Sequence, residues 1–198
     1  NRMENVCRFV DKIGARGNIT QTIRSAVRRV YKPGELYEFD EAMGEESLNR
    51  NIALHKQWNG GANGRIKILF GPQGADFMSM DLLLKVQKVA KELNSKIHMH
   101  TQQGDRETFQ IVKRYGKRPV ALLQEIGYLD DSLIAVHLTD CTDEEAAVVA
   151  RSGAYMIPRP CTSGPIHAVW PPSTAFQAAG GNFALASYLD PRSHCPNL

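Results

Sequence analysis

The chain has 198 residues, with 24 Lys and Arg against 21 Asp and Glu, a formal net charge of +3 and 42% hydrophobic residues. This length allows one sizeable hydrophobic core, and the small charge, with no dense basic run, argues against a nucleic-acid or acidic-membrane partner. No apolar run approaches the roughly 18 residues that cross a bilayer, and no signal-peptide pattern opens the chain.

The first elements in chain order are a strand and a helix. Residues 18–25 are expected to form a strand, and residues 45–58 a helix with Leu48, Ile52 and His55 on one face. Residues 66–70 are a short run rich in β-formers that Gly71 and Pro72 close.

The middle of the chain alternates between helical and strand periods. Ser79 is expected to cap a helix whose apolar residues recur at three and four positions, and residues 96–100 form the next strand. Asp105 begins a helix that Gly116 ends, and Pro119 begins a shorter helix that ends at Gly127.

The alternation then repeats. Residues 133–137 are expected to form a buried strand, a capping box at 142–145 begins a helix that ends at Gly153, and strands follow at 154–157 and 183–186. About six strands separated by helices predict an α/β fold with parallel strands and helical crossovers.

A doubly wound sheet and part of a (β/α)₈ barrel of the TIM type both fit this alternation. The G-x-G-x-x-G turn of a dinucleotide-binding sheet is absent, and the chain is shorter than the roughly 250 residues of a full barrel. A barrel formed by this chain would therefore be a partial one.

The composition changes near residue 156. Residues 156–198 carry three charged side chains, Arg159, Asp190 and Arg192, and seven of the ten prolines. We expect a single partial domain over residues 1–198, well patterned over 1–155 and diverged over 156–198. The four widely spaced cysteines form neither a zinc motif nor a disulfide framework, which favours a reducing, cytoplasmic location.

Two histidines end apolar strands. His100 and His137 each close a predicted strand and precede polar loop residues. Ligands of parallel α/β folds gather at the carboxyl ends of the strands, so both imidazoles are candidates for one metal or acid/base site, although a histidine at a strand end can also be a merely structural polar residue. His98 shares the parity of His100, so it either faces the same interior or fills a buried layer.

The sequence over 64–155 resembles the amidohydrolase superfamily. The matching features are a strand that ends in His100 and is followed by Gln103, the Tyr115-Gly116-Lys117-Arg118-Pro119 segment, a strand ending in His137, and the helix from Thr142 to Gly153-Ala154. The branch it resembles contains cytosine and guanine deaminases, methylthioadenosine and S-adenosylhomocysteine deaminases and triazine hydrolases (chlorohydrolases).

The resemblance implies roles for several residues. His100 corresponds to a metal ligand, and His137 to a catalytic histidine that contacts the substrate and helps to activate the attacking water. Gln103 occupies the position of the catalytic acid/base glutamate, although an amide cannot carry a proton as a carboxylate does. Gln73 and His98 are expected to line the substrate pocket.

The ends of the chain depart from the family pattern. No H-x-H that would supply two further metal ligands occurs in residues 1–60, and Tyr188 stands where the pattern has a metal-binding aspartate, with Asp190 two residues later. We therefore expect Asp190 to be a second metal ligand, on the condition that the strand ends two residues later than the family pattern has it. The pattern decays after Ala154, which also fits a frameshifted or misassigned tail.

The resemblance thus implies a metal-dependent hydrolase with one divalent metal, zinc or alternatively iron. It would act on a small nitrogen heterocycle and remove an amino or similar leaving group. It also allows a homodimer, and implies neither a nucleic-acid nor a membrane partner. The alternative is a non-catalytic or degenerate barrel fragment that acts as a structural or binding module, which Gln103 and Tyr188 favour.

Overall fold

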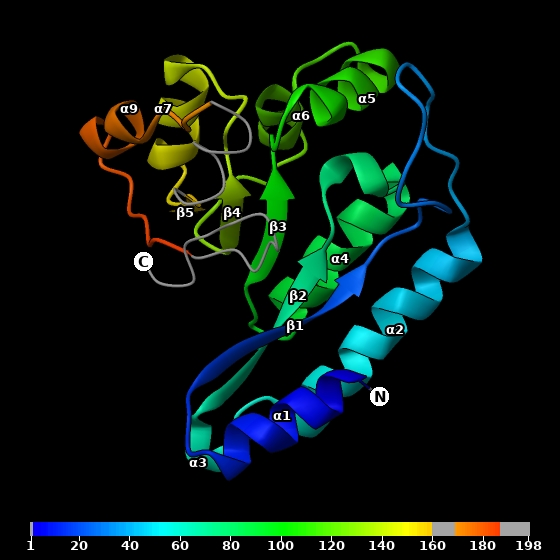
Figure 1. The fold of residues 1–198 in the computed structure, drawn as a ribbon, viewed down its shortest axis with the longest axis vertical. Coiled ribbons are helices and arrows are strands. Elements are labelled where there is room, and N and C mark those ends of the chain that lie inside the picture. The colour runs from blue at the N-terminus through cyan, green and yellow to red at the C-terminus, as the bar shows by residue number, and fades with distance from the viewer. Residues whose placement is uncertain (1, 160–168, 187–198) are drawn as a thin grey trace. The chain divides into compact units, whose positions relative to one another are not determined.

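The computed structural model describes residues 2–159 and 169–186, which form parallel strands alternating with helices (Figure 1). The chain divides into two compact units, Asn1–His98 and Met99–Leu198. Asp190 and Tyr188 lie outside the described residues. None of the helices in the described ranges is long and apolar enough to cross a membrane.

The first unit is built on two long parallel strands, β1 (Gly17–Ile23) and β2 (Ile66–Pro72). They pair in register from Gly17 opposite Ile66 to Ile23 opposite Pro72, and Phe70 pairs with Ile97 at the start of β3 (Ile97–Thr101). The strand order in this unit is therefore β1-β2-β3. The strands predicted at 18–25, 66–70 and 96–100 are confirmed, each within one or two residues of its expected bounds.

Helices cover these strands. The elements of the first unit are α1 (Arg2–Lys12), α2 (Glu41–Trp58), α3 (Gly61–Gly64), the 3₁₀ turn η1 (Ala75–Phe77) and α4 (Met80–Glu92). Figure 1 shows α1 and α2 running beside the β1–β2 pair, which they contact. The core between them consists of Cys7, Ile19, Leu54, Ile66 and Ile68.

Side-chain caps explain where two of these helices begin. The Asp40 carboxylate accepts a hydrogen bond from the Met43 N–H at 2.9 Å, so α2 begins at Glu41, four residues before its predicted start. Ser79 caps α4 as expected, because its hydroxyl accepts a hydrogen bond from the Leu82 N–H. The helix α1 was not predicted from the sequence.

The second unit holds the rest of β3, then α5 (Asp105–Tyr115), α6 (Pro119–Glu125), β4 (Leu133–His137), α7 (Asp143–Arg151), β5 (Tyr155–Ile157) and α9 (Ser173–Ala178). The strand order is β3-β4-β5, and β4 pairs parallel to β5 from Ile134 opposite Tyr155 to Val136 opposite Ile157. The predicted parallel α/β architecture is confirmed.

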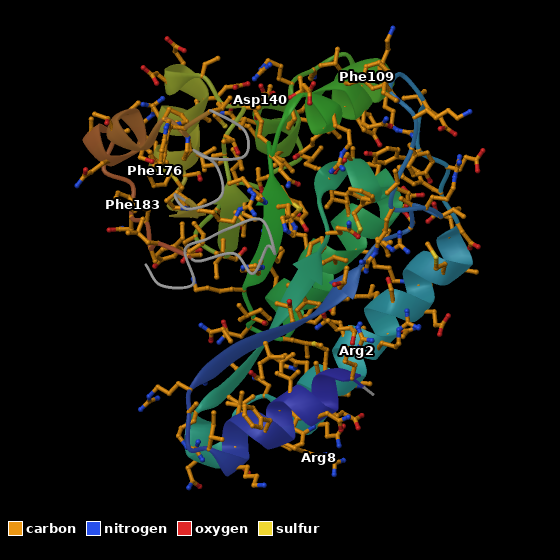
Figure 2. The ribbon with its side chains drawn as sticks, in the orientation of Figure 1. Arg2, Arg8, Phe109, Asp140, Phe176 and Phe183 are labelled. Carbon is orange, nitrogen blue, oxygen red and sulfur yellow. The ribbon has the colours of Figure 1, made fainter. Side chains whose placement is uncertain are left out.

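The strand expected at 183–186 forms only in part, as a short pairing beside β5. Phe183, labelled in Figure 2, makes a parallel bridge to Met156, and the Ala184 and Ala186 N–H groups donate to the Met156 and Pro158 carbonyls, each at 3.1 Å. The preceding helix α9 is anchored by Phe176, which is fully buried and packs so closely on Gly181 that a β-carbon at that glycine would overlap the ring. The described strands therefore number five, against about six expected.

The amide of Asn51 joins α2 to the β1–β2 ladder. This side chain is fully buried, donates to the Leu69 carbonyl at 3.1 Å and accepts from the Gln21 N–H at 3.3 Å. It therefore satisfies one backbone group on each strand, a buried carbonyl on β2 and a partly buried N–H on β1.

Replacing Asn51 with Ala should lower the free energy of unfolding by about 1–3 kcal/mol, because one buried and one partly buried backbone group lose their partner. Denaturant unfolding measures this loss. The matched control is Arg50→Ala on the exposed face of the same helix, where Arg50 forms an exposed ion pair with Glu46 and the cost should be at most about 0.5 kcal/mol. Equal costs for the two variants would contradict the role given to Asn51.

Candidate active site

The carboxyl ends of β3 and β4 bring two histidines together. These ends lie in the second unit, the two strands are neighbours in the sheet, and the ring centroids of His100 and His137 stack 5.0 Å apart with an angle of 27° between the planes. His137 is 1% exposed and His100 is half-buried. The predicted meeting of these two side chains at one strand edge is thus seen in the structure.

The backbone after β4 turns in an unusual way. His137 has φ of 86° and Leu138 has φ of 53°, a region that residues with a β-carbon rarely adopt. Two backbone hydrogen bonds hold this turn to the end of β3, from the Leu138 N–H to the Thr101 carbonyl at 3.0 Å and from the Asp140 N–H to the Gln102 carbonyl at 3.1 Å. The strained turn fixes where the His137 ring lies.

A buried amide extends this support. The Gln102 side chain is fully buried, and its Nε2 donates to the Asp140 carbonyl at 2.8 Å and to Glu145 Oε2 at 2.7 Å. Its Oε1 accepts from the Val120 N–H at the start of α6. Both hydrogens and the oxygen of one amide therefore tie α6, α7 and the loop after β4 to β3.

Arg118 completes the network from the other side. Its Nε donates to Glu145 Oε1 at 2.7 Å, and its Nη2 donates to the Asp140 carbonyl at 2.6 Å. Glu145 also closes the predicted capping box with Thr142. Burial alone would raise the pKa of Glu145, but the hydrogen bonds from Arg118, the Thr142 N–H and Gln102 outweigh that effect and lower it.

Arg159 contacts the buried histidine directly. Its Nε–H donates to His137 Nδ1 at 2.9 Å, and only 3% of Arg159 is exposed. The residue lies two positions beyond the end of β5, next to the strand that carries His137. No sequence motif indicated this contact, since the two residues are 22 positions apart and Arg159 stands in the charge-poor segment.

Gln103 lies at the rim of a cavity in the second unit. The cavity has a volume of about 310 Å³ and is lined by Gln103, Gly104, Asp105, Thr139, Asp140 and Val169. Figure 2 labels Asp140 in the loop after β4, where its carboxylate accepts a hydrogen bond from the Thr108 hydroxyl at 2.5 Å. The Gln103 N–H donates to Glu107 Oε2 at 2.9 Å, so the backbone at this position is fixed by the first turn of α5.

Two further predicted site residues, Gln73 and His98, belong to the first unit. Gln73 follows β2, is half-buried, and its N–H donates to the Ile23 carbonyl at 2.9 Å. His98 alternates along β3 with the buried Ile97 and Met99, as its parity predicts, and burial lowers its pKa below the ordinary value.

The residues present supply part of a metal site. His100 offers one imidazole, while the His137 Nδ1 already accepts a hydrogen bond from a cationic side chain. Within residues 2–159 and 169–186 no group of three or more His, Cys, Asp and Glu side chains could hold a metal ion. A hydrolytic zinc needs about three protein ligands, so the described residues fit as one contributor to such a site and do not complete it.

The comparisons with known proteins agree on one family. The Amidohydrolase family matches residues 10–168. A 5-methylthioadenosine/S-adenosylhomocysteine deaminase of Thermoanaerobacter pseudethanolicus is 27% identical over 185 residues, which are 93% of this chain and 40% of that protein. The chain therefore spans about 40% of the length of this relative.

Solved structures are similar as well. The crystal structure of an adenosine deaminase from Xanthomonas campestris with bound zinc is 26% identical, with a TM-score of 0.77 over 91% of this chain and 38% of that one. The atrazine chlorohydrolase TrzN from Arthrobacter aurescens TC1, complexed with zinc, has a TM-score of 0.77 over 91% of this chain and 39% of its own, at 15% identity. At 15% identity, the similarity to the chlorohydrolase shows a shared fold and nothing more.

Removing the charge of Glu145 should destabilise the second unit. Because the folded pKa lies below its ordinary value of 4.5, the stabilisation is fully present above about pH 4.5 and is lost as the pH falls through the folded value. Glu145→Gln should cost about 1–3 kcal/mol at pH 7 and flatten the decline of stability in acid.

Chemical denaturation between pH 3 and 7 measures both effects. Asp143→Asn is the matched control, since this carboxylate is exposed in the first turn of the same helix. A Glu145→Gln variant that keeps the acid sensitivity of the unmodified protein would show that the network does not depend on this charge.

Proposed function

The chain belongs to the amidohydrolase family, and on that premise we propose that the protein is a metal-dependent hydrolase that removes an amino or similar leaving group from a nitrogen heterocycle. The observation that carries the proposal is the stacked pair of His100 and His137 at the carboxyl ends of neighbouring parallel strands. This edge of such a sheet is where ligands bind in barrels of this class.

The proposed substrate is a small 6-aminopurine nucleoside. Support comes from the printed activities of two relatives, a deaminase of 5-methylthioadenosine and S-adenosylhomocysteine and a deaminase of adenosine. In the proposed reaction a water oxygen bonds to the ring carbon that carries the amino group, and the bond from that carbon to nitrogen breaks to release ammonia. The reaction consumes one water and needs no redox partner.

His100 is proposed as a ligand of one divalent metal, with zinc favoured by the zinc-containing adenosine deaminase structure and iron as the alternative. A divalent metal at such a site supplies a hydroxide nucleophile at neutral pH. His137 would hold the substrate or the attacking oxygen by a hydrogen bond beside that ligand. His98 and Gln73 are proposed to line the substrate pocket, and the same family pattern would make Asp190 or Tyr188 the ligand position near the end of the chain.

Gln103 limits the proton chemistry at this site. An amide can donate a hydrogen bond to a leaving group but cannot deliver a proton and recover it at neutral pH. Asp105 and Asp140 line the same cavity, and the Glu107 carboxylate accepts a hydrogen bond from the Gln103 N–H at 2.9 Å. Gln103 would therefore orient the leaving group by a hydrogen bond. The proton that the leaving group takes up would come from water or from one of these carboxylates.

The location, partners and assembly of the protein are also part of the proposal. We propose a cytoplasmic protein that acts on a small molecule, with neither a nucleic-acid nor a membrane partner and with a homodimer as its assembly. A second candidate function, a non-catalytic binding module of the same fold, is favoured by Gln103 and by the incomplete ligand set among the described residues.

His100→Ala in the full-length protein should abolish stoichiometric zinc binding and reduce ammonia release from 5-methylthioadenosine by at least about 10³-fold, because a metal ligand is lost. Elemental analysis and an ammonia assay measure the two effects. His98→Gln, on the same strand, serves as the control that should retain zinc and alter KM. Full zinc and activity in His100→Ala would overturn the assignment, and an unmodified protein that binds no metal after loading would favour the binding module.

Gln103→Glu should raise kcat for an amine leaving group by about 10-fold or more, since it restores a side chain that can transfer a proton. The gain should be absent for a chloride leaving group, which departs without protonation. Steady-state rates on an aminopurine nucleoside and its 6-chloro analogue compare the two cases. Equal changes on both substrates would remove residue 103 from the proton transfer.

A further inference from the structure

In the hydrogen bond between Arg159 and His137, the arginine is the donor and the histidine is the acceptor. The guanidinium has only N–H donors and stays charged at any physiological pH, so the ring nitrogen that it meets must act as the acceptor. The contact joins Arg159 Nε to His137 Nδ1 at 2.9 Å, a normal hydrogen-bond length. His137 Nδ1 therefore carries no proton while this bond exists.

The other ring nitrogen then carries the proton. A neutral imidazole has one N–H, so an accepting Nδ1 places the hydrogen on Nε2. A proton on Nδ1 would point at the Arg159 N–H across 2.9 Å, which would replace an attraction with a repulsion between two donors. The contact thus selects one tautomer of His137.

The surroundings keep this selection in place. Arg159 and His137 are 3% and 1% exposed, so water does not compete for the bond. The His100 ring stacks against the His137 ring, and the turn at His137 and Leu138 is tied to β3 by the Leu138 N–H. The imidazole is held by its backbone, by a stacked ring and by the guanidinium.

We propose that Arg159 is a positioning residue that fixes His137 as its Nε2–H tautomer, so that His137 acts as a hydrogen-bond donor in the site. His137 in this form donates to an acceptor atom of the substrate or to the attacking oxygen. It does not take a proton through Nδ1, and it does not bind a metal through Nδ1. The catalytic consequence rests on the proposed function, whereas the tautomer itself does not.

The test is a long-range ¹H–¹⁵N spectrum of the full-length protein labelled in its histidines, with His137→Gln used to assign the signals. The unmodified protein should show a protonated Nε2 and an unprotonated Nδ1 at His137. Arg159→Met keeps an unbranched chain but has no donor, and it should shift a measurable fraction of His137 to the Nδ1–H form. Arg159→Lys keeps a charged donor and should restore the Nε2–H pattern in part or in full.

Activity is the second readout. Arg159→Met should lower kcat by about 10–100-fold, as expected when a catalytic imidazole is held in the wrong tautomer. The matched control is Arg151→Met on the exposed end of α7, which should change neither the spectrum nor kcat. Thermal unfolding of each variant separates these effects from loss of the fold.

Two results would overturn the proposal. One is an Nδ1–H signal for His137 in the unmodified protein, which needs no variant to fold. The other is a folded Arg159→Met variant whose His137 pattern is unchanged. If no hydrolase activity is found, the proposed function fails while the spectra still decide the role of Arg159, so the two failures are distinguishable.

Discussion

The strained turn at the end of β4 is the feature on which the rest of the site depends. His137 and Leu138 both adopt positive φ, which costs free energy of the order of 1–3 kcal/mol per residue and persists only when the surroundings hold it. Here the end of β3 holds it through the Leu138 and Asp140 N–H groups. The Gln102 amide and the Arg118–Glu145 ion pair brace the same loop from two helices. Without this support the imidazole would have no single position from which to act.

The residues around this turn have separate roles. The side chains of Gln102, Arg118 and Glu145 take no part in the proposed reaction, and their hydrogen bonds hold the backbone of the loop after β4 in place. The groups that carry the proposed chemistry, His100 and His137, then meet at a ring separation of 5.0 Å. Arg159 then determines which nitrogen of the buried His137 ring is the donor. The hydrogen bonds thus fix the loop backbone, the position of the ring and the location of its proton.

The strands and the two strand-end histidines could be predicted because their signals are local. An apolar run with period two and a histidine at its end places the side chain at the carboxyl edge of a parallel sheet whatever the rest of the chain does. Arg159 could not be found this way, since its partner is 22 residues away and becomes adjacent only through the pairing of β4 with β5. The strand expected at 183–186 forms only in part: its apolar residues suit a strand and its backbone bonds to the β5 segment, but the pairing is limited to one parallel bridge at Phe183. Helix α1 was missed although Met3, Cys7 and Val10 recur at helical spacing and pack on the core of the first unit, while Val6 and Phe9 remain exposed.

The proposed site takes one metal ligand, His100, and one hydrogen-bond donor, His137, from this chain. Anomalous diffraction at the zinc edge, on crystals of the zinc-loaded full-length protein, locates the metal directly. We expect a zinc peak about 2.0–2.1 Å from a ring nitrogen of His100, with Arg159 still bonded to His137 Nδ1. A zinc ion bound to His137 Nδ1 in place of Arg159, or bound elsewhere with no contact to His100, would rule out this assignment.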